Sequence, residues 1–405
     1  MSTIIRSMIE NDLYKFSMSH YYQVNYPNAW GTFAFHDRNN TEYTEEFVEM
    51  LKNEFKNLDK LFLQRSEFEW CVKNIPYIPQ YYWEWLQGFR YNSYDIKTWL
   101  DDEKHLHIEV SDLMYRVTFY EIPILAIVSE LYHRYIGDGF ETFDAINDAM
   151  MDGMIEKTKI AENHNLFFAD FGLRRRFSSH SEDAVVKFMS KHCETFVGTS
   201  NVYLAKVYGV KPIGSIAHET VCFEAAINGP KNANYNVMEN WSNTYGGALG
   251  TMLPDTFTLD VFLNNFSMKM AKLYDGVRHD SGDPFVFTDK MIAKYKSYGI
   301  EPMSKVIIFS DGLDFNKAAE IKEYCAGKIK ASFGIGTNLV NPIGIIGENG
   351  KEIKNCNIVM KLKHCRVDNN HPIYGCVKLS DVPTKAIGNP DDIACYKYLL
   401  NIKNG

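Results

Sequence analysis

The sequence predicts an α/β protein whose largest part is a closed barrel of alternating strands and helices. Seven times within residues 166–338, a short apolar run ends in a loop of small, charged or hydroxyl residues, and a helical pattern usually follows. Successive runs are spaced by roughly 20 to 37 residues, as strand–helix–strand units require. An open doubly wound sheet uses the same units but gathers ligands at one or two switch points. Seven polar strand-end loops favour the barrel, where such loops share one face.

The individual elements follow from the periodicity of apolar residues. The seven expected strands of the barrel are Leu166–Ala169, Thr195–Val197, Ile213–Ile216, Gly250–Leu253, Tyr274–Val277, Val306–Phe309 and Ile329–Phe333. Before them, strands are expected at Thr32–Phe35 and Leu106–Val110, and helices at Glu45–Lys56, Ile124–Tyr135 and Phe140–Asn163.

Composition excludes several classes of protein. A chain of 405 residues predicts one large domain with a smaller companion. The net charge of −8 argues against a nucleic-acid binder or a membrane-surface binder. Eight cysteines without a two-residue spacing predict reduced thiols. The N-terminus carries Glu10 and Asp12 where a signal peptide needs an apolar stretch. We therefore expect a cytoplasmic protein.

The segment 170–176, with the sequence DFGLRRR, is the strongest local signal for a binding site. Three adjacent arginines repel one another unless an anion or several carboxylates offset their charge, so at a strand end they indicate an anion site. Phe171 adds a ring for stacking. A solvated basic turn explains the same residues, because runs of charge are commonly exposed. The segment alone does not decide between the two.

Two further strand-end loops carry residues suited to catalysis. His218 follows an expected strand and is suited to be a general base, a metal ligand or a nucleophile, although a structural histidine is the more common case. The segment 278–284, RHDSGDP, supplies a cation and two carboxylates for ribose hydroxyls, phosphate or hydrated Mg²⁺. It also fits a helix start, with Asp283 as cap and Pro284 as the first helical residue.

The segment 334–338, GIGTN, is similar to a phosphate cradle. Its glycines let backbone N–H groups approach a ligand, and Thr337 adds a hydroxyl group. A short GxG motif is weak by itself, but phosphate sites are common after the last strands of such barrels. The lysine-containing P-loop and the six-residue dinucleotide motif are absent from the sequence.

Taken in order, these motifs resemble the nicotinate phosphoribosyltransferase family, in its bacterial and fungal branch. Each motif is short, but seven in the same order over most of the chain are specific. They lie at residues 12–15, 170–174, 198–201, 216–219, 276–284, 310–314 and 334–338.

The resemblance implies an irregular seven-stranded barrel beside a smaller α+β domain formed by the N- and C-terminal segments. On this basis we expect an N-terminal α+β domain with connecting helices at 1–155 and the catalytic barrel at 156–350. The C-terminal segment, 351–405, is expected to return to the small domain. The resemblance also implies a homodimer whose active sites are shared between subunits.

The same resemblance implies the reaction. ATP phosphorylates His218, the phosphoenzyme binds phosphoribosyl pyrophosphate, and nicotinate displaces pyrophosphate at the anomeric carbon. The products are nicotinate mononucleotide, pyrophosphate, ADP and phosphate. Mg²⁺ is expected to enter on pyrophosphate or ATP, so no metal site made by the protein is expected.

Site roles are carried over residue by residue from the matching motifs. Phe171 and, from the opposite subunit, Tyr14 are expected to stack on the nicotinate ring. Arg174 is expected to face its carboxylate, and Ser200 and Ser215 to line the same pocket.

The ribose phosphates are expected to bind a second group of residues. These are Arg278, Asp280, Asp311, Gly336 and Thr337, with Arg38 of the opposite subunit assisting. Asp280 and Arg278 are also expected to take part in catalysis.

The residue at position 200, a serine, bears on whether nicotinate or nicotinamide is the substrate. Related nicotinamide enzymes carry an aspartate at this place, which accepts hydrogen bonds from an amide and repels a carboxylate. Serine removes that repulsion, so nicotinate is favoured. Two alternatives stay open: a nicotinamide phosphoribosyltransferase, and a catalytically inactive relative that binds a nucleotide.

Overall fold

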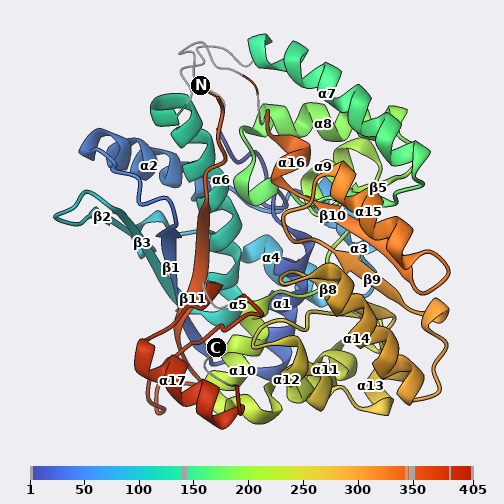
Figure 1. Cartoon of the computed structure of the whole chain (residues 1–405). Helices are drawn as coiled ribbons and strands as arrows, with labels where there is room; N and C mark the ends of the chain where they lie inside the picture. The colour runs from blue at the N-terminus through green and yellow to red at the C-terminus, as the bar shows by residue number, and fades with distance from the viewer. Residues whose placement is uncertain (1–2, 138–143, 343–344, 346–351, 383–384, 403–405) are drawn as a thin grey trace.

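Two sheets organise the molecule in this computed structural model (Figure 1). All residues are described except 1–2, 138–143, 343–344, 346–351, 383–384 and 403–405. The larger sheet has seven parallel strands in the order β6-β5-β4-β10-β9-β8-β7. Their bounds are β4 Phe168–Asp170, β5 Phe196–Thr199, β6 Lys211–Pro212, β7 Thr251–Met252, β8 Gly276–His279, β9 Val306–Phe309 and β10 Lys330–Ile335.

The expected number of parallel strands is confirmed, and their closure into a complete barrel is not. Among the described residues, no backbone pairing joins the two outer strands, β6 and β7. A side chain spans this gap instead: the Ser215 hydroxyl donates a hydrogen bond to the Thr251 carbonyl at 2.9 Å. The seven strands therefore form a curled sheet that a hydroxyl group, and not a strand ladder, links at its edges.

The strand expected at Ile213–Ile216 was placed too late in the sequence. The paired residues are Lys211–Pro212, and the chain then leaves the sheet. It does so because helix α1 passes there: a Cβ atom on Gly214 would lie 3.1 Å from the Tyr14 nitrogen. The Ser17 hydroxyl donates to the Ser215 carbonyl at 2.7 Å, which holds this segment against the helix.

The smaller sheet is antiparallel and combines the two ends of the chain. Its order is β12-β11-β1-β3-β2, so β11 from the C-terminal segment lies beside β1 from the N-terminal segment (Figure 1). Their register runs from Trp30 opposite Arg366 to Asp37 opposite Ile358. The strand bounds are β1 Trp30–Asp37, β2 Ile96–Leu100, β3 Leu106–Leu113, β11 Ile358–Arg366 and β12 Tyr374–Gly375.

Helices pack against both sheets, and several of them begin after a residue whose side chain caps the first turn. The Asp283 carboxylate accepts hydrogen bonds from the backbone N–H groups of residues 285 and 286, with Pro284 at the first helical position, as the sequence predicts. Part of the helix expected at 140–163 lies outside the described residues. The helices are α1 Leu13–Asn25, α2 Glu45–Leu58, α3 Arg65–Asn74, α4 Gln80–Gly88, α5 Met114–Val117, α6 Glu121–Tyr132, α7 Asp144–Asn163, α8 Ser179–His192, α9 Val202–Tyr208, α10 His218–Asn228, α11 Ala233–Tyr245, α12 Leu259–Asn265, α13 Met268–Leu273, α14 Pro284–Ser297, α15 Phe315–Cys325, α16 Thr337–Val340 and α17 Pro390–Leu399.

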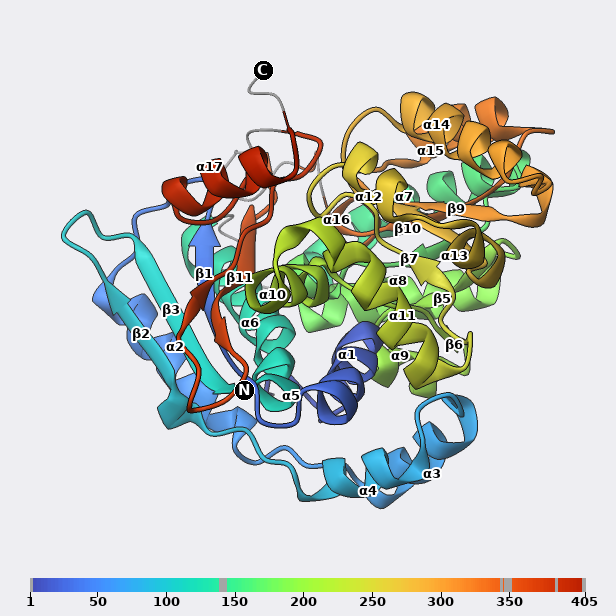
Figure 2. The same ribbon diagram turned by 90° about the horizontal axis from the view of Figure 1, so that it is seen from below.

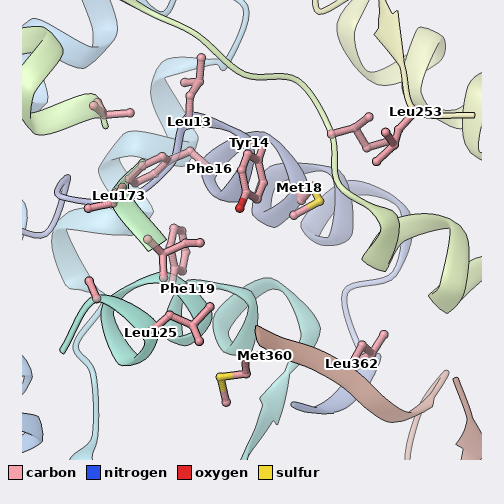
Figure 3. Close-up of a cluster of buried hydrophobic side chains, with 14 of the residues drawn as sticks. Leu13, Tyr14, Phe16, Met18, Phe119, Leu125, Leu173, Leu253, Met360 and Leu362 are labelled. Atoms are coloured by element: carbon pink, nitrogen blue, oxygen red, sulfur yellow. The ribbon is translucent and has the colours of Figure 1, made fainter. Parts of the chain in front are cut away.

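Helix α1 joins the two parts of the molecule. It lies between α5 and α11 (Figure 2). Apolar side chains of α1 are buried together with side chains of α6, the loop after β4, and β11 (Figure 3). The labelled members of this cluster are Leu13, Tyr14, Phe16, Met18, Phe119, Leu125, Leu173, Leu253, Met360 and Leu362.

All eight cysteines are free thiols, and only Cys395 is exposed. None of the described helices combines the length and the apolar character that a membrane span requires.

Candidate active site

A cavity of about 550 Å³ lies where the ends of the parallel strands meet β11 of the smaller sheet. Five of the seven strand-end loops line it, namely those after β4, β6, β8, β9 and β10. The prediction that these loops converge is therefore confirmed for five loops. Ten of the predicted site residues line the cavity: Tyr14, Arg38, Phe171, Arg174, His218, Arg278, Asp280, Asp311, Gly336 and Thr337.

Tyr14 and Arg38 line the cavity of their own chain. Their entry into the site of a second subunit stays a prediction. Tyr14 reaches it because α1 is tied to the loop after β5, where the Leu13 N–H group donates to the Ser200 carbonyl at 2.8 Å. Arg38 reaches it from the end of β1, where its N–H group donates to the Asn357 carbonyl at 3.1 Å. A homodimer with shared active sites stays a prediction.

Ser200 and Ser215 are not among the described residues that line the cavity. The Ser200 hydroxyl donates to Asp12 Oδ1 at 2.6 Å, and both side chains are buried. Burial raises the pKa of Asp12, against the opposing effects of Arg174 and the Ser200 hydrogen bond. Ser215 binds the Thr251 carbonyl, as described above. Both serines thus support the wall that holds Tyr14, and direct contact with a substrate stays a prediction for them.

His218 is the first residue of α10 and is almost completely buried. Burial lowers its pKa to about 4, and Lys378 acts in the same direction, against Asp255 and Asp280. The imidazole is therefore neutral at neutral pH. Its Nε2 atom lies 3.1 Å from Asp280 Oδ2, and its Nδ1 atom lies 3.0 Å from the Thr256 hydroxyl.

Asp280 determines which nitrogen of His218 carries the proton. Burial alone would raise the pKa of Asp280, but Arg278 and the hydrogen bond from His218 outweigh burial and hold this pKa well below its ordinary value. An ionised carboxylate only accepts hydrogen bonds, so Nε2 is the protonated nitrogen and donates to Asp280. Nδ1 then accepts from the Thr256 hydroxyl. The other oxygen of Asp280 accepts from the Ser310 hydroxyl at 2.9 Å.

The side chains of the three adjacent arginines lie in three different environments. Neither an anion site nor a solvated basic turn describes all three. Arg174 faces the cavity, and its side chain keeps 38% of its exposure. Arg175 also lines the cavity, and burial with the nearby charges of Arg174 and Arg38 lowers its pKa to about 10. Arg176 is fully buried and pairs with two carboxylates.

Arg176 pairs with one carboxylate that is distant in sequence and with one that is near. Its Nη1 atom lies 2.7 Å from Glu10 Oε1 and 2.9 Å from Glu182 Oε2. All three side chains are fully buried. Arg176 therefore belongs to a structural ion-pair network beneath the cavity, which a run of charge in the sequence does not reveal.

The ring of Phe171 is the reason why position 334 is a glycine. A Cβ atom on Gly334 would lie 2.4 Å from the Phe171 ring, and one on Gly336 would lie 2.9 Å from the Phe171 carbonyl. Any larger residue at 334 would displace the ring from the cavity wall. These glycines thus position the aromatic side chain, and their contact with phosphate stays a prediction.

Several residues of the cavity were not found from the sequence. Lys361 and Lys378 line it from the C-terminal segment, where no motif marks them. Asp255 and Thr256 lie behind His218, in the loop after β7, and no motif in the sequence marks them. Asp255 Oδ1 lies 3.9 Å from His218 Nε2 and has no hydrogen-bond partner among the described residues.

His218, Asp255 and Asp280 place one possible ligand atom each within 4.8 Å of one another. An imidazole is a poor ligand for Mg²⁺, which prefers oxygen atoms and keeps several of its waters. Both oxygens of Asp280 already accept hydrogen bonds. The donor set therefore does not fit a resident magnesium ion held by the protein alone.

Comparisons with known proteins match the same family over nearly the whole chain. The nicotinate phosphoribosyltransferase (NAPRTase) family profile matches residues 166–402, and the profile of the N-terminal domain of that family matches residues 9–129. The nicotinate phosphoribosyltransferase of Methanosarcina acetivorans is 38% identical over 99% of this chain and 99% of its own length. That of Chromohalobacter salexigens is 38% identical over 98% of each chain.

Solved structures agree as well. The crystal structure of nicotinate phosphoribosyltransferase from Porphyromonas gingivalis is 42% identical and superposes with a TM-score of 0.92, covering 98% of this chain and 100% of that one. The crystal structure of the Vibrio cholerae protein of the same name is 31% identical with a TM-score of 0.92, covering 99% of this chain and 95% of that one. The chain belongs to the nicotinate phosphoribosyltransferase family.

Proposed function

We propose that this chain is an ATP-coupled nicotinate phosphoribosyltransferase acting in NAD biosynthesis. It would convert nicotinate, phosphoribosyl pyrophosphate and ATP into nicotinate mononucleotide, pyrophosphate, ADP and phosphate. One observation supports the proposal: four groups that suit these substrates line one cavity. They are the neutral imidazole of His218, the guanidinium group of Arg174, whose N–H groups are free to bind a ligand, and the aromatic rings of Tyr14 and Phe171.

The imidazole suits phosphoryl transfer from ATP. Asp280 lines the cavity and Thr256 does not, so the Nε2 side of His218 faces the ligand space. Only the ring nitrogen without a proton has a lone pair for attack, so reaction at Nε2 requires the proton to move to Nδ1, which then donates to the Thr256 hydroxyl. As Nε2 bonds to the γ-phosphorus, the bond from that phosphorus to the ADP oxygen breaks, and the imidazole gains a positive charge that the nearby Asp280 carboxylate stabilises.

The remaining residues suit alignment and charge placement. Displacement at an anomeric carbon passes through a state with oxocarbenium character, so the protein mainly orients the reactants. Tyr14 and Phe171 offer faces for the pyridine ring, and Arg174 offers a cation for its carboxylate. Arg278 and the loop residues Gly336 and Thr337 would hold phosphates, with Mg²⁺ entering on pyrophosphate or ATP.

A nicotinamide phosphoribosyltransferase is the second candidate, and the charge of Arg174 speaks against it. A neutral carboxamide gives the guanidinium group no anion to pair with, and leaving a partly buried cation unpaired is costly. The third candidate is a binding protein without catalysis. Such a protein does not need a neutral imidazole that is hydrogen-bonded to a carboxylate and lies in one cavity with Arg174 and Arg278.

The test is incubation with γ-labelled ATP. Wild type is expected to acquire acid-labile label at His218, and His218→Gln is expected to acquire none and to lose ATP hydrolysis while keeping weak, ATP-independent transfer. Nicotinate and nicotinamide are then compared as acceptors. Full ATP turnover by His218→Gln contradicts the role of His218, and preferential use of nicotinamide contradicts the substrate.

A further inference from the structure

Lys15 is a buried cation directly beneath the aromatic part of the cavity. Its side chain has no exposure to solvent. Its Nζ atom lies 5.6 Å from the centre of the Tyr14 ring and 5.3 Å from that of the Phe33 ring, and both rings line the cavity. Burying a charge is costly unless it is paired, so the partners of Lys15 define what this charge does.

Two buried carboxylates and a hydroxyl group surround Lys15. Its Nζ atom lies 2.6 Å from Glu121 Oε2 and also binds Glu219 Oε2. It donates to the Thr118 hydroxyl at 3.2 Å, and this hydroxyl donates to Glu219 Oε1 at 2.8 Å. Lys15 thus links α1, which carries Tyr14, to α6 and to α10.

Glu121 lies between Lys15 and Arg174, and its short contact is with Lys15. Its Oε1 atom is 3.8 Å from Arg174 Nη1, which is beyond hydrogen-bond distance. The Arg174 side chain makes no direct hydrogen bond to any residue that the structure describes. An arginine beside a carboxylate ordinarily forms a two-bond pair with it, so this separation needs a cause.

The cause is competition between the two cations for one carboxylate. Without the Lys15 charge, the buried Glu121 carboxylate would turn to Arg174, because an unpaired buried charge costs more than a pair. Lys361 also lies near Glu121, but burial lowers the pKa of Lys361 to about 7, so its charge is only partial at neutral pH. Lys15 is therefore the cation that holds Glu121.

We propose that Lys15 is a specificity-determining positioning residue that binds Glu121 and so keeps Arg174 available for the carboxylate of an anionic aromatic substrate. This inference rests on the proposed function, because it assumes that Arg174 receives the carboxylate of nicotinate. A neutral carboxamide ring makes no ion pair with Arg174, so its binding depends little on Lys15. Lys15 therefore raises the preference for the anionic ring without touching it.

Three variants test this: Lys15→Met, Glu121→Gln and the double variant Lys15→Met/Glu121→Gln. The readouts are the KM for nicotinate and the inhibition constant of nicotinamide as its competitor. Lys15→Met is expected to raise the KM for nicotinate roughly 10- to 100-fold, the scale of a lost charged hydrogen bond. Glu121→Gln is expected not to raise it, because the competing carboxylate is gone.

The double variant is the decisive measurement. Its KM for nicotinate is expected to lie within about threefold of that of Glu121→Gln, because Lys15 has no competing carboxylate left to hold. The inhibition constant of nicotinamide is expected to change by less than about threefold in all three variants. The comparison of the double variant with Glu121→Gln remains available even if Lys15→Met alone fails to fold.

Lys305→Met serves as the matched control. Lys305 is another buried lysine, and it binds the Tyr274 and Lys272 carbonyls outside the cavity. Its loss is expected to leave the KM for nicotinate unchanged. An equal effect of Lys15→Met on nicotinate and nicotinamide, or a tenfold higher KM in the double variant than in Glu121→Gln, overturns the inference. Absence of nicotinate transfer by wild type would instead overturn the proposed function.

Discussion

The phosphorylation of His218 is expected to persist in mild acid. Burial lowers the pKa of His218 to about 4, and only the neutral imidazole is a nucleophile. At pH 5.5, a histidine with a pKa of about 4 is about 97% neutral, whereas one with the ordinary pKa of about 6.5 is about 9% neutral. The rate of phosphoenzyme formation should therefore stay within about twofold between pH 7.5 and 5.5.

The assay is a single turnover with γ-labelled ATP and Mg²⁺, saturating at each pH, with acid-labile label as the product. Removing Lys378, the second cause of the lowered pKa, is expected to move the midpoint of the profile upward in Lys378→Met. Comparing histidine NMR titrations of wild type and His218→Gln identifies the signal of this residue among the twelve histidines. A tenfold fall in rate with a midpoint near pH 6.5 would refute the reasoning.

The same lowered pKa affects stability with a defined sign. The unfolded chain takes up a proton at His218 below its ordinary pKa, and the folded protein does so only near pH 4. The contribution is therefore complete above pH 6.5 and is lost as the pH falls from 6.5 to 4, by about 3 kcal/mol in all. Urea unfolding of wild type and His218→Gln over this range measures it.

Three further variants test the surroundings of the cavity. Arg174→Met should raise the KM for nicotinate roughly 10- to 100-fold and that for phosphoribosyl pyrophosphate less; steady-state kinetics with a larger effect on the donor would assign Arg174 to a phosphate. Ser200→Asp should weaken nicotinate use, because it places a carboxylate beside Asp12 in the wall behind Tyr14; unchanged nicotinate kinetics would contradict this. Arg176→Met should lower the free energy of unfolding in urea by roughly 3 to 5 kcal/mol, because it removes the only ion-pair partner of Glu182 among the described residues and leaves Glu10 with Arg6 alone. A loss below about 1 kcal/mol would mean that the pair contributes no more than a surface salt bridge.

The sequence predicted the parts of the fold that are set by local patterns. The parallel strands were predicted from apolar runs followed by polar loops. The strands are apolar because they lie in the interior, and the loops are polar because they follow at the strand ends. The cap at Asp283 was found for the same reason, since its partners are the next few residues. The strand at 211–212 was misplaced because its position depends on α1, which is distant in sequence.

The candidate site was predictable where a residue lies at the end of a strand or in the loop that follows it, as His218, Arg278 and Asp280 do. The roles of Arg175 and Arg176 were not predictable from the sequence. The three adjacent arginines are identical in type, and tertiary contacts set the environment of each side chain. The pairing of Arg176 with Glu10 spans 166 residues and leaves no mark in either local sequence. Lys361 and Lys378 were missed for a similar reason, because tertiary pairing of β11 with β1 brings them to the cavity.

The place of β11 inside the smaller sheet has a consequence for synthesis on the ribosome. β11 pairs with β1 on one side and with β12 on the other, so the sheet stays open until the last part of the chain has emerged. All seven parallel strands are translated before then. A nascent chain or a product truncated before β11 would thus carry His218 and its loops without Lys361 and Lys378, and the cavity wall would be completed only after these residues have been translated.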